Sequence, residues 1–216
     1  MLSEDRGRMV ATQIQARGIT DPLVLEAMRA VPREWFVPAR LARFAHEDRP
    51  LPIGEEQTIS QPYIVAVMMH AAEVKPGARV LEIGTGSGYG AAVLSRIAAE
   101  VYTVERVGAL AEPARYRLTE LGYANVRVRE GDGTLGWAEY APYDAILVTA
   151  GGPRAPQTLL SQLAMGGRLI MPVGPCAGHQ RLVRVTRTDT QEYRYEDLEE
   201  VTFVPLIGAE GWSEGG

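Results

Sequence analysis

Cysteine is almost absent from this chain of 216 residues, with Cys176 as the single example. One thiol excludes a disulfide within the chain and is typical of a reducing compartment, so we expect a cytoplasmic protein. Long apolar runs are missing too, because no stretch approaches the roughly 18 residues of a membrane-spanning helix. The charged residues that follow Met1 also lack the apolar core of a signal peptide.

Positive charge is scarce as well. Lysine and arginine total 22 against 27 acidic residues, which leaves a net charge of −5. A nucleic-acid-binding surface needs a basic field, so we expect no nucleic-acid partner. One cysteine and three histidines do not form a spaced ligand set, so we expect no metal. The composition, 46% hydrophobic and 23% charged, is typical of a globular protein of one domain, which we expect to be a monomer.

Glycine, in contrast, is concentrated in one informative stretch, residues 80–90 (VLEIGTGSGYG). Its apolar start predicts a buried strand, and the apolar residues from Ala91 to Ala98 predict a helix. Gly84, Gly86 and Gly88 allow a sharp turn and the close approach of a ligand. A strand, glycine turn and helix in this order are typical of the nucleotide cradle of doubly wound α/β folds.

The spacing around this turn indicates which nucleotide is bound. Tyr89 takes the place of the third glycine of the dinucleotide fingerprint, and Glu82 would repel a phosphate. The next predicted strand, residues 101–104, ends at Glu105, which suits the two hydroxyls of a ribose. A ligand with a ribose, an amine and no phosphate is S-adenosylmethionine. A tight turn without a ligand and a nucleotide-dependent oxidoreductase remain as alternatives.

The remaining pattern predicts a doubly wound sheet. Residues 4–17 and a segment capped by Asp21 predict helices, and we treat residues 1–52 as a helical cap. Strands are predicted at 126–128, 143–149 and 168–173, with helices between them, which implies mostly parallel pairing. An antiparallel hairpin follows from residue 181, and residues 201–206 predict a last strand. We assign residues 53–212 to the core and expect a flexible tail at 213–216.

Two polar sites admit a structural or a functional interpretation. Residues 53–62 form a predicted polar loop in which Ser60 either caps the next helix or helps to hold a carboxylate. Asp132, between Gly131 and Gly133, is typical of a turn, and after a third strand it also suits the amino group of an adenine.

Taken together, these segments resemble the protein-L-isoaspartate (D-aspartate) O-methyltransferase family almost from end to end. The segments that carry the resemblance are 9–19 (MVATQIQARGI), 31–38 (VPREWFVP), 50–68 (PLPIGEEQTISQPYIVAVM), 80–89 (VLEIGTGSGY), 101–106 (VYTVER), 131–133 (GDG), 143–150 (YDAILVTA), 166–174 (GGRLIMPVG) and 203–206 (FVPL). Segment 57–62 is the most specific, because it belongs to the substrate side. Gly90 and His46 depart from residues that the family often has there.

The resemblance implies a Rossmann-like methyltransferase fold and assigns the site residues. Ser60 takes the position of the active-site serine, and Val204, Pro205 and Leu206 would lie near the substrate. The implied binding residues for S-adenosylmethionine and its product S-adenosylhomocysteine are Gln57, Thr58, Ile59, Ser60, Glu82, Gly84, Thr85, Gly86, Ser87, Gly88, Glu105, Arg106, Asp132 and Gly133.

The implied reaction is methyl transfer to the free α-carboxylate of L-isoaspartyl, and also D-aspartyl, residues in damaged peptides and proteins. The ester would then close to a succinimide and start repair. A methyltransferase of the same fold that acts on a small molecule or a biosynthetic peptide remains an alternative, as does a non-catalytic binding module.

Overall fold

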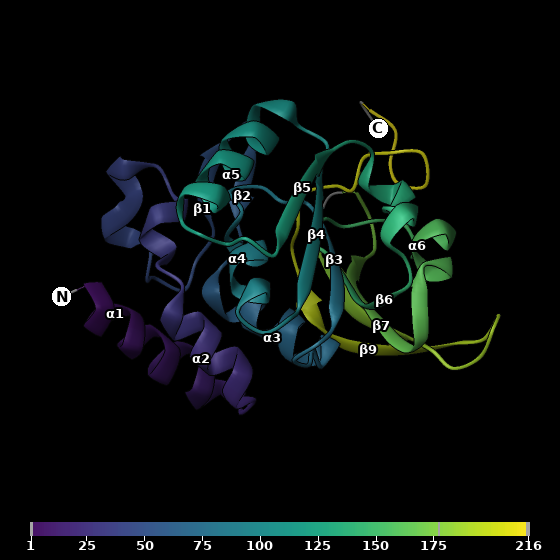
Figure 1. Cartoon of the computed structure of the whole chain (residues 1–216), viewed down its shortest axis with the longest axis horizontal. Coiled ribbons are helices and arrows are strands. Elements are labelled where there is room, and N and C mark those ends of the chain that lie inside the picture. The colour runs from purple at the N-terminus through teal and green to yellow at the C-terminus, as the bar shows by residue number, and fades with distance from the viewer. Residues whose placement is uncertain (1, 177, 215–216) are drawn as a thin grey trace.

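A seven-stranded mixed sheet forms the centre of the molecule (Figure 1). The structure is a computed structural model that describes residues 2–176 and 178–214. The strands lie in the order β5-β4-β3-β6-β7-β8-β9, and the first five of these are parallel. Their bounds are β3 Arg79–Ile83, β4 Glu100–Glu105, β5 Val126–Glu130, β6 Tyr143–Val148, β7 Leu163–Val173, β8 Gln180–Arg187 and β9 Tyr193–Val201. The predicted α/β fold with an antiparallel C-terminal part is confirmed.

The strand order reverses at β3, which pairs with β4 on one side and with β6 on the other. Val80 lies opposite both Val101 and Ala145 in the two registers. The chain therefore turns to opposite sides of the sheet after β3 and after β5. This places a crevice at the carboxyl ends of β3, β4 and β6, where doubly wound folds bind ligands.

Helices cover both faces of the sheet (Figure 1). Alternate residues of β3 point to opposite faces, so that Val80 belongs to one apolar cluster and Leu81 to the other. The helices α3 (Pro62–Ala72), α4 (Tyr89–Ser95) and α5 (Gly108–Glu120) pack on the first face. The second face is covered by α6 (Gln157–Ser161) and by short 3-10 turns at Gly133–Leu135 and Ala138–Tyr140.

The first part of the chain is helical and packs against α3 and α4. It contains α1 (Leu2–Met9), a π-turn at Val10–Ile14, 3-10 turns at Gln15–Arg17, Arg33–Phe36 and Ala39–Phe44, and α2 (Pro22–Ala30). As predicted, Asp21 caps α2, because its carboxylate accepts a hydrogen bond from Leu23 N at 2.9 Å. His46 contacts Glu34 at 3.2 Å within this region, away from the crevice. None of the described helices has both the length and the apolar character needed to cross a bilayer.

The predicted polar loop at 53–62 is wrong in part, because most of it is a hairpin. Strand β1 (Leu51–Gly54) pairs antiparallel with β2 (Gln57–Ile59). Leu51 and Ile59 lie opposite each other and are both buried, so the hairpin is anchored by apolar contact rather than by its polar residues. The two turn residues Glu55 and Glu56 have positive φ angles.

The predicted last strand at 201–206 is also wrong. β9 ends at Val201, and residues 202–206 make a single parallel bridge to Gly151, in the loop after β6. Gly151 donates to Val204 O and accepts from Leu206 N, both at 2.8 Å. Pro205 lies between these bonds and has no N–H with which to extend a ladder. In the tail, Glu214 pairs with Arg106, while residues 215–216 lie outside the described residues.

Candidate active site

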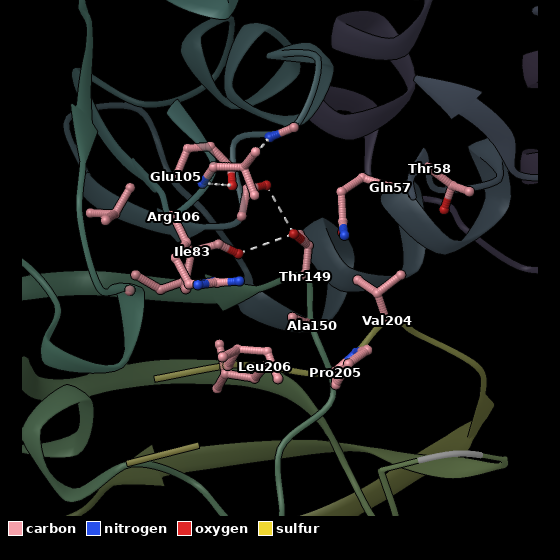
Figure 2. A pocket seen from close by; sticks show the side chains of 16 residues that line it. Gln57, Thr58, Ile83, Glu105, Arg106, Thr149, Ala150, Val204, Pro205 and Leu206 are labelled. Carbon is pink, nitrogen blue, oxygen red and sulfur yellow. Dashed lines mark hydrogen bonds between the residues drawn. The ribbon is translucent and has the colours of Figure 1, made fainter. Parts of the chain in front are cut away.

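A cavity opens at the carboxyl ends of β3, β4 and β6, at the point where the strand order reverses (Figure 2). One wall comes from these strand ends, a second from the β1–β2 hairpin, and a third from residues 204–207. The residues that line it are Gln57, Thr58, Ile83, Gly84, Gly86, Val104, Glu105, Arg106, Val107, Gly133, Thr149, Ala150, Val204, Pro205, Leu206 and Ile207.

The glycine-rich turn forms the floor of the cavity. Among Gly84, Gly86 and Gly88, Gly84 has the least room for a side chain. Its φ angle of +95° lies in the left-handed region that side-chain-bearing residues rarely adopt. A Cβ at this position would lie 2.3 Å from Thr149 Oγ1, which donates to the carbonyls of both Ile83 and Gly84 (Figure 2). The turn is therefore locked to the end of β6 through the Thr149 hydroxyl.

Glu105 presents a fixed carboxylate at the end of β4. Its two oxygens accept hydrogen bonds from Gly86 N at 2.8 Å and Val107 N at 2.9 Å. The side chain is only 6% exposed and lines the cavity. A carboxylate held by two backbone donors keeps further acceptor sites, which is what a ribose diol requires.

Glu82 lies beneath the turn and does not line the cavity. Its carboxyl bonds with Thr103 Oγ1 at 2.7 Å, and Thr103 in turn contacts the Thr85 hydroxyl at 2.6 Å. Complete burial raises the pKa of Glu82 to about 8, although the hydrogen bond from Thr103 acts to lower the pKa. Position 90 leaves room for this group, because a Cβ on Gly90 would lie 2.1 Å from Glu82 Oε1.

Asp132 and Arg106 both contact the C-terminal segment, Asp132 through Ala209 N and Arg106 through the Glu214 carboxylate. The Asp132 carboxylate accepts from Thr134 N at 2.8 Å, Thr134 Oγ1 at 2.7 Å and Ala209 N at 2.7 Å. Desolvation would raise the pKa of Asp132, but these hydrogen bonds outweigh it and hold the pKa below its usual value. Asp132 therefore caps a 3-10 turn, as the turn interpretation predicts, and it does not line the cavity.

Ser60 lies beside the cavity, in a neighbouring groove that also contains Gln61 and Phe203. Thr58, Thr149 and Val204 line both the cavity and this groove, so the two hollows meet at these residues. Among the described residues, the Ser60 hydroxyl has no hydrogen-bond partner. The helix-cap interpretation of Ser60 is wrong, because α3 follows Gln61 without a side-chain cap and Asp48 accepts from Tyr63 N instead.

A buried arginine fixes the backbone at Ser60. Arg33 is 0% exposed and donates to Ser60 O and to Ala45 O, both at 2.8 Å. Its guanidinium lies 4.9 Å from the centre of the Tyr89 ring, immediately after the glycine turn. Burial lowers the pKa of Arg33 to about 10, which still leaves it charged at neutral pH.

The structure thus divides the sequence-predicted residues into two sets. Those that line the cavity are Gln57, Thr58, Gly84, Gly86, Glu105, Arg106, Gly133, Val204, Pro205 and Leu206, while Ile59, Ser60, Glu82, Thr85, Ser87, Gly88 and Asp132 lie outside its wall. Sequence reasoning missed Thr149 as a site residue, although its place at the end of a predicted strand could have indicated it. Within the described part of the chain, no group of three or more acidic, histidine or cysteine side chains could hold a metal ion.

Comparison with known proteins decides the family. The family model for protein-L-isoaspartate (D-aspartate) O-methyltransferase matches residues 4–211. The chain belongs to this family. Protein-L-isoaspartate O-methyltransferase 1 of Rhodopseudomonas palustris (strain HaA2) is 62% identical over 96% of this chain and 85% of its own length. The enzyme of Protochlamydia amoebophila (strain UWE25) is 61% identical over 94% of this chain and 97% of its own.

Solved structures agree with this assignment. A protein-L-isoaspartate O-methyltransferase superposes with a TM-score of 0.85 at 33% identity, covering 95% of this chain and 67% of that one. A Plasmodium falciparum protein described as a putative member, solved with S-adenosyl-L-homocysteine, gives 0.80 at 24% identity over 94% and 98% of the two chains, and supports the fold.

Proposed function

We propose that this chain transfers the methyl group of S-adenosylmethionine to the free α-carboxylate of L-isoaspartyl, and also D-aspartyl, residues in damaged peptides and proteins. The observation that carries the proposal is the meeting of two hollows. A cavity with the fixed Glu105 carboxylate adjoins a groove with the Ser60 hydroxyl, and Thr58, Thr149 and Val204 are common to both. A donor in the first hollow and an acceptor in the second would face each other there.

The cavity residues fit S-adenosylmethionine. Glu105 offers acceptors to the ribose hydroxyls, and Gly84 and Gly86 leave the floor free of side chains. The Glu105 carboxylate in the cavity wall favours a cationic ligand over a phosphate. When bound, S-adenosylmethionine supplies the methyl group that is transferred to the substrate carboxylate.

The residues of this chain would act mainly by positioning. An α-carboxylate with a pKa near ~3.5 is already ionised at neutral pH, so no general base is required. The Ser60 hydroxyl can donate to one carboxylate oxygen, while Arg33 holds the Ser60 backbone in place. Such alignment of reactants can contribute about 7–11 kcal/mol. Val204 is the apolar residue at the junction and would limit the access of water there, which favours loss of charge in the transition state.

The remaining parts of the proposal concern context. The backbone nitrogen of the next substrate residue displaces methanol from the methyl ester and forms a succinimide, which water opens partly to normal aspartate, and this starts repair. We place this activity in the cytoplasm, in a monomer without a nucleic-acid partner. The single cysteine supports the location, and the net charge of −5 supports the absence of a nucleic-acid partner. Because the nucleophile is ionised without help, the reaction needs no metal, and chelation with EDTA is expected to leave the rate unchanged.

A methylation assay with one peptide in isoaspartyl and aspartyl versions tests the reaction. Transfer to the isoaspartyl version alone is expected. Equal transfer to both, or transfer to neither, would favour a methyltransferase with another acceptor. For the cofactor, Glu105→Ala should weaken S-adenosylhomocysteine binding by about 10- to 100-fold in calorimetry, since hydrogen bonds to a charged group are lost. Glu100→Ala, on the same strand but outside the cavity, is the control.

A further inference from the structure

A second groove continues from the groove that holds Ser60. The groove at Ser60 runs past Arg17 and Phe203 to Glu199. The second groove is lined by Tyr63 and His70 of α3 and by Leu198 and Glu199 of β9. Glu199 lines both, so the two grooves meet at this side chain, and we call them together the β9 groove.

An irregularity in β9 shapes this groove. Glu200 lies opposite Arg181 and Asp197 lies opposite Val183, so Leu198 and Glu199 share the single partner position of Leu182. This is a β-bulge, which interrupts the alternation of side chains along a strand and often redirects one near an active site. As a result, the adjacent residues Leu198 and Glu199 both line the second groove.

Glu199 brings into the β9 groove a negative charge that Arg17 offsets only in part. Within the described part of the chain, its carboxylate has no hydrogen bond and no ion pair. Partial burial raises the pKa of Glu199, and Arg17 opposes this shift. Arg17 is itself engaged, because it pairs with Asp48 at 2.7 Å and lies over the Tyr63 ring. The neighbouring acids are occupied, since Asp197 and Glu200 both lie within 4 Å of Arg181, at 3.8 and 3.7 Å.

The outer edge of β9 is also open. β9 is the last strand in the sheet order and pairs only with β8 among the described strands. Such an edge offers backbone donors and acceptors to an extended chain, and adding a strand to it is a common mode of peptide recognition. A polypeptide that enters at Ser60 and leaves along the β9 groove would pass this edge.

We propose that the substrate segment beside the isoaspartyl residue lies in the β9 groove, and that Glu199 selects substrates with a lysine or arginine in that segment. The proposal rests on the proposed function and names the class of damaged protein that the enzyme prefers. The Glu199 carboxylate favours a basic side chain, while the continuity with the Ser60 groove and the strand edge of β9 favour an extended peptide.

Steady-state kinetics on isoaspartyl peptides of one length tests this. A single lysine is scanned over the six positions on each side of the isoaspartyl residue, against the same peptides with glutamine. We expect the KM to fall by about two- to fivefold for lysine at one or two neighbouring positions, which is the effect of one partly exposed ion pair. In Glu199→Gln this advantage should disappear with kcat unchanged, and in wild type it should shrink in high salt.

Glu192→Gln is the matched control, because Glu192 is exposed beyond the far end of β9 and lines neither groove. It should keep the full preference for lysine. Equal KM values for lysine and glutamine peptides at every position in wild type, or the same loss in both variants, would overturn the proposal while leaving methyl transfer established. Absence of methylation on every isoaspartyl peptide would instead refute the proposed function.

Discussion

Gly84 shows how a single residue can be required for two separate reasons. Its left-handed backbone disfavours a side chain by about 1–2 kcal/mol, and its Cβ would also displace the Thr149 hydroxyl. Gly77 has nearly the same φ angle, +92°, but open space around it. We therefore expect Gly84→Ala and Gly77→Ala to lose similar stability from the backbone, and only Gly84→Ala to lose cofactor binding as well.

Thermal unfolding and calorimetry with S-adenosylhomocysteine measure the two effects separately. At least a tenfold weaker affinity in Gly84→Ala, beside a normal affinity in Gly77→Ala, is the expected pattern. Normal binding by both variants would show that the Gly84–Thr149 contact does not shape the cofactor site.

A different prediction concerns Ser60, whose hydroxyl has no hydrogen-bond partner among the residues that the structure describes and is therefore available to a substrate. If the hydroxyl orients the substrate carboxylate, Ser60→Ala should lower kcat for an isoaspartyl peptide by roughly 10- to 1,000-fold, the range for an orienting group. Cofactor affinity should change little, since Ser60 lies outside the cavity wall. Ser161→Ala, on α6, is a control without expected effect. Full turnover by the Ser60 variant would remove this residue from the mechanism.

The residues that sequence reasoning placed best are those that follow a strand directly. Glu105 and Gly84 were predicted from their position at strand ends, and both line the cavity. Glu82 was harder to place, because strand alternation turns its side chain toward Thr103 while the next residue, Ile83, lines the cavity. The contact of Thr149 with Gly84 could not be predicted, because it depends on the pairing of β3 with β6, which lie about 65 residues apart in the chain.

At the scale of elements, long buried strands were predicted well and short exposed ones were not. The strands β3, β4 and β6 have five or six residues and mostly buried apolar side chains, whereas β1 and β2 have three or four residues with a mixed pattern. Their pairing depends on the contact of Leu51 with Ile59, which no local pattern shows. The segment after Val201 has the residues of a strand but lacks a neighbouring edge on which to extend, apart from its bridge to Gly151.

A prediction at the scale of elements concerns Arg33. It connects its own 3-10 turn to Ala45, after the next 3-10 turn, and to Ser60, between β2 and α3. Arg33→Met would remove the donor to the half-buried Ser60 carbonyl and to the buried Ala45 carbonyl. We expect the free energy of unfolding to fall by about 2–5 kcal/mol, as when one side of a buried polar pair is removed. Below its unfolding temperature the variant should also lose kcat more than cofactor affinity, because the Ser60 backbone is released while Glu105 is untouched.

Urea unfolding, peptide methylation and cofactor calorimetry on the same preparation separate these effects. Arg40→Met, at an exposed position of the same region, is the control and should behave as wild type. A loss confined to stability, with kcat preserved, would mean that Arg33 supports the fold without positioning Ser60.

For the whole molecule, the mixed sheet explains why the proposed cofactor and substrate sites adjoin. The parallel part, with its reversal at β3, creates the crevice, while the antiparallel strands β8 and β9 extend the sheet away from it. Segment 202–207 then returns from β9 to the crevice and supplies its third wall. The proposed substrate side is therefore built from the two ends of the core, the β1–β2 hairpin and the segment after β9.

Burial of Glu82 at the centre of this sheet should make global stability depend on pH. The folded chain keeps the Glu82 proton up to a pKa of about 8, whereas the unfolded chain loses it near the ordinary value of 4.5. Between these pH values the folded state binds more protons, so the free energy of unfolding falls as pH rises, by up to about 1.4 kcal/mol per pH unit from this group. Below about pH 4.5 the contribution is constant.

Urea unfolding of wild type and Glu82→Gln at a series of pH values from about 5 to 8 measures this slope. The glutamine side chain cannot ionise, so the variant should gain stability relative to wild type as pH rises, and subtracting the two curves cancels all other titrating groups. Exposed Glu139→Gln should run parallel to wild type. Parallel curves for Glu82→Gln would mean that the buried carboxyl is already ionised in the folded protein, with a cation or water that compensates its charge beneath the glycine turn.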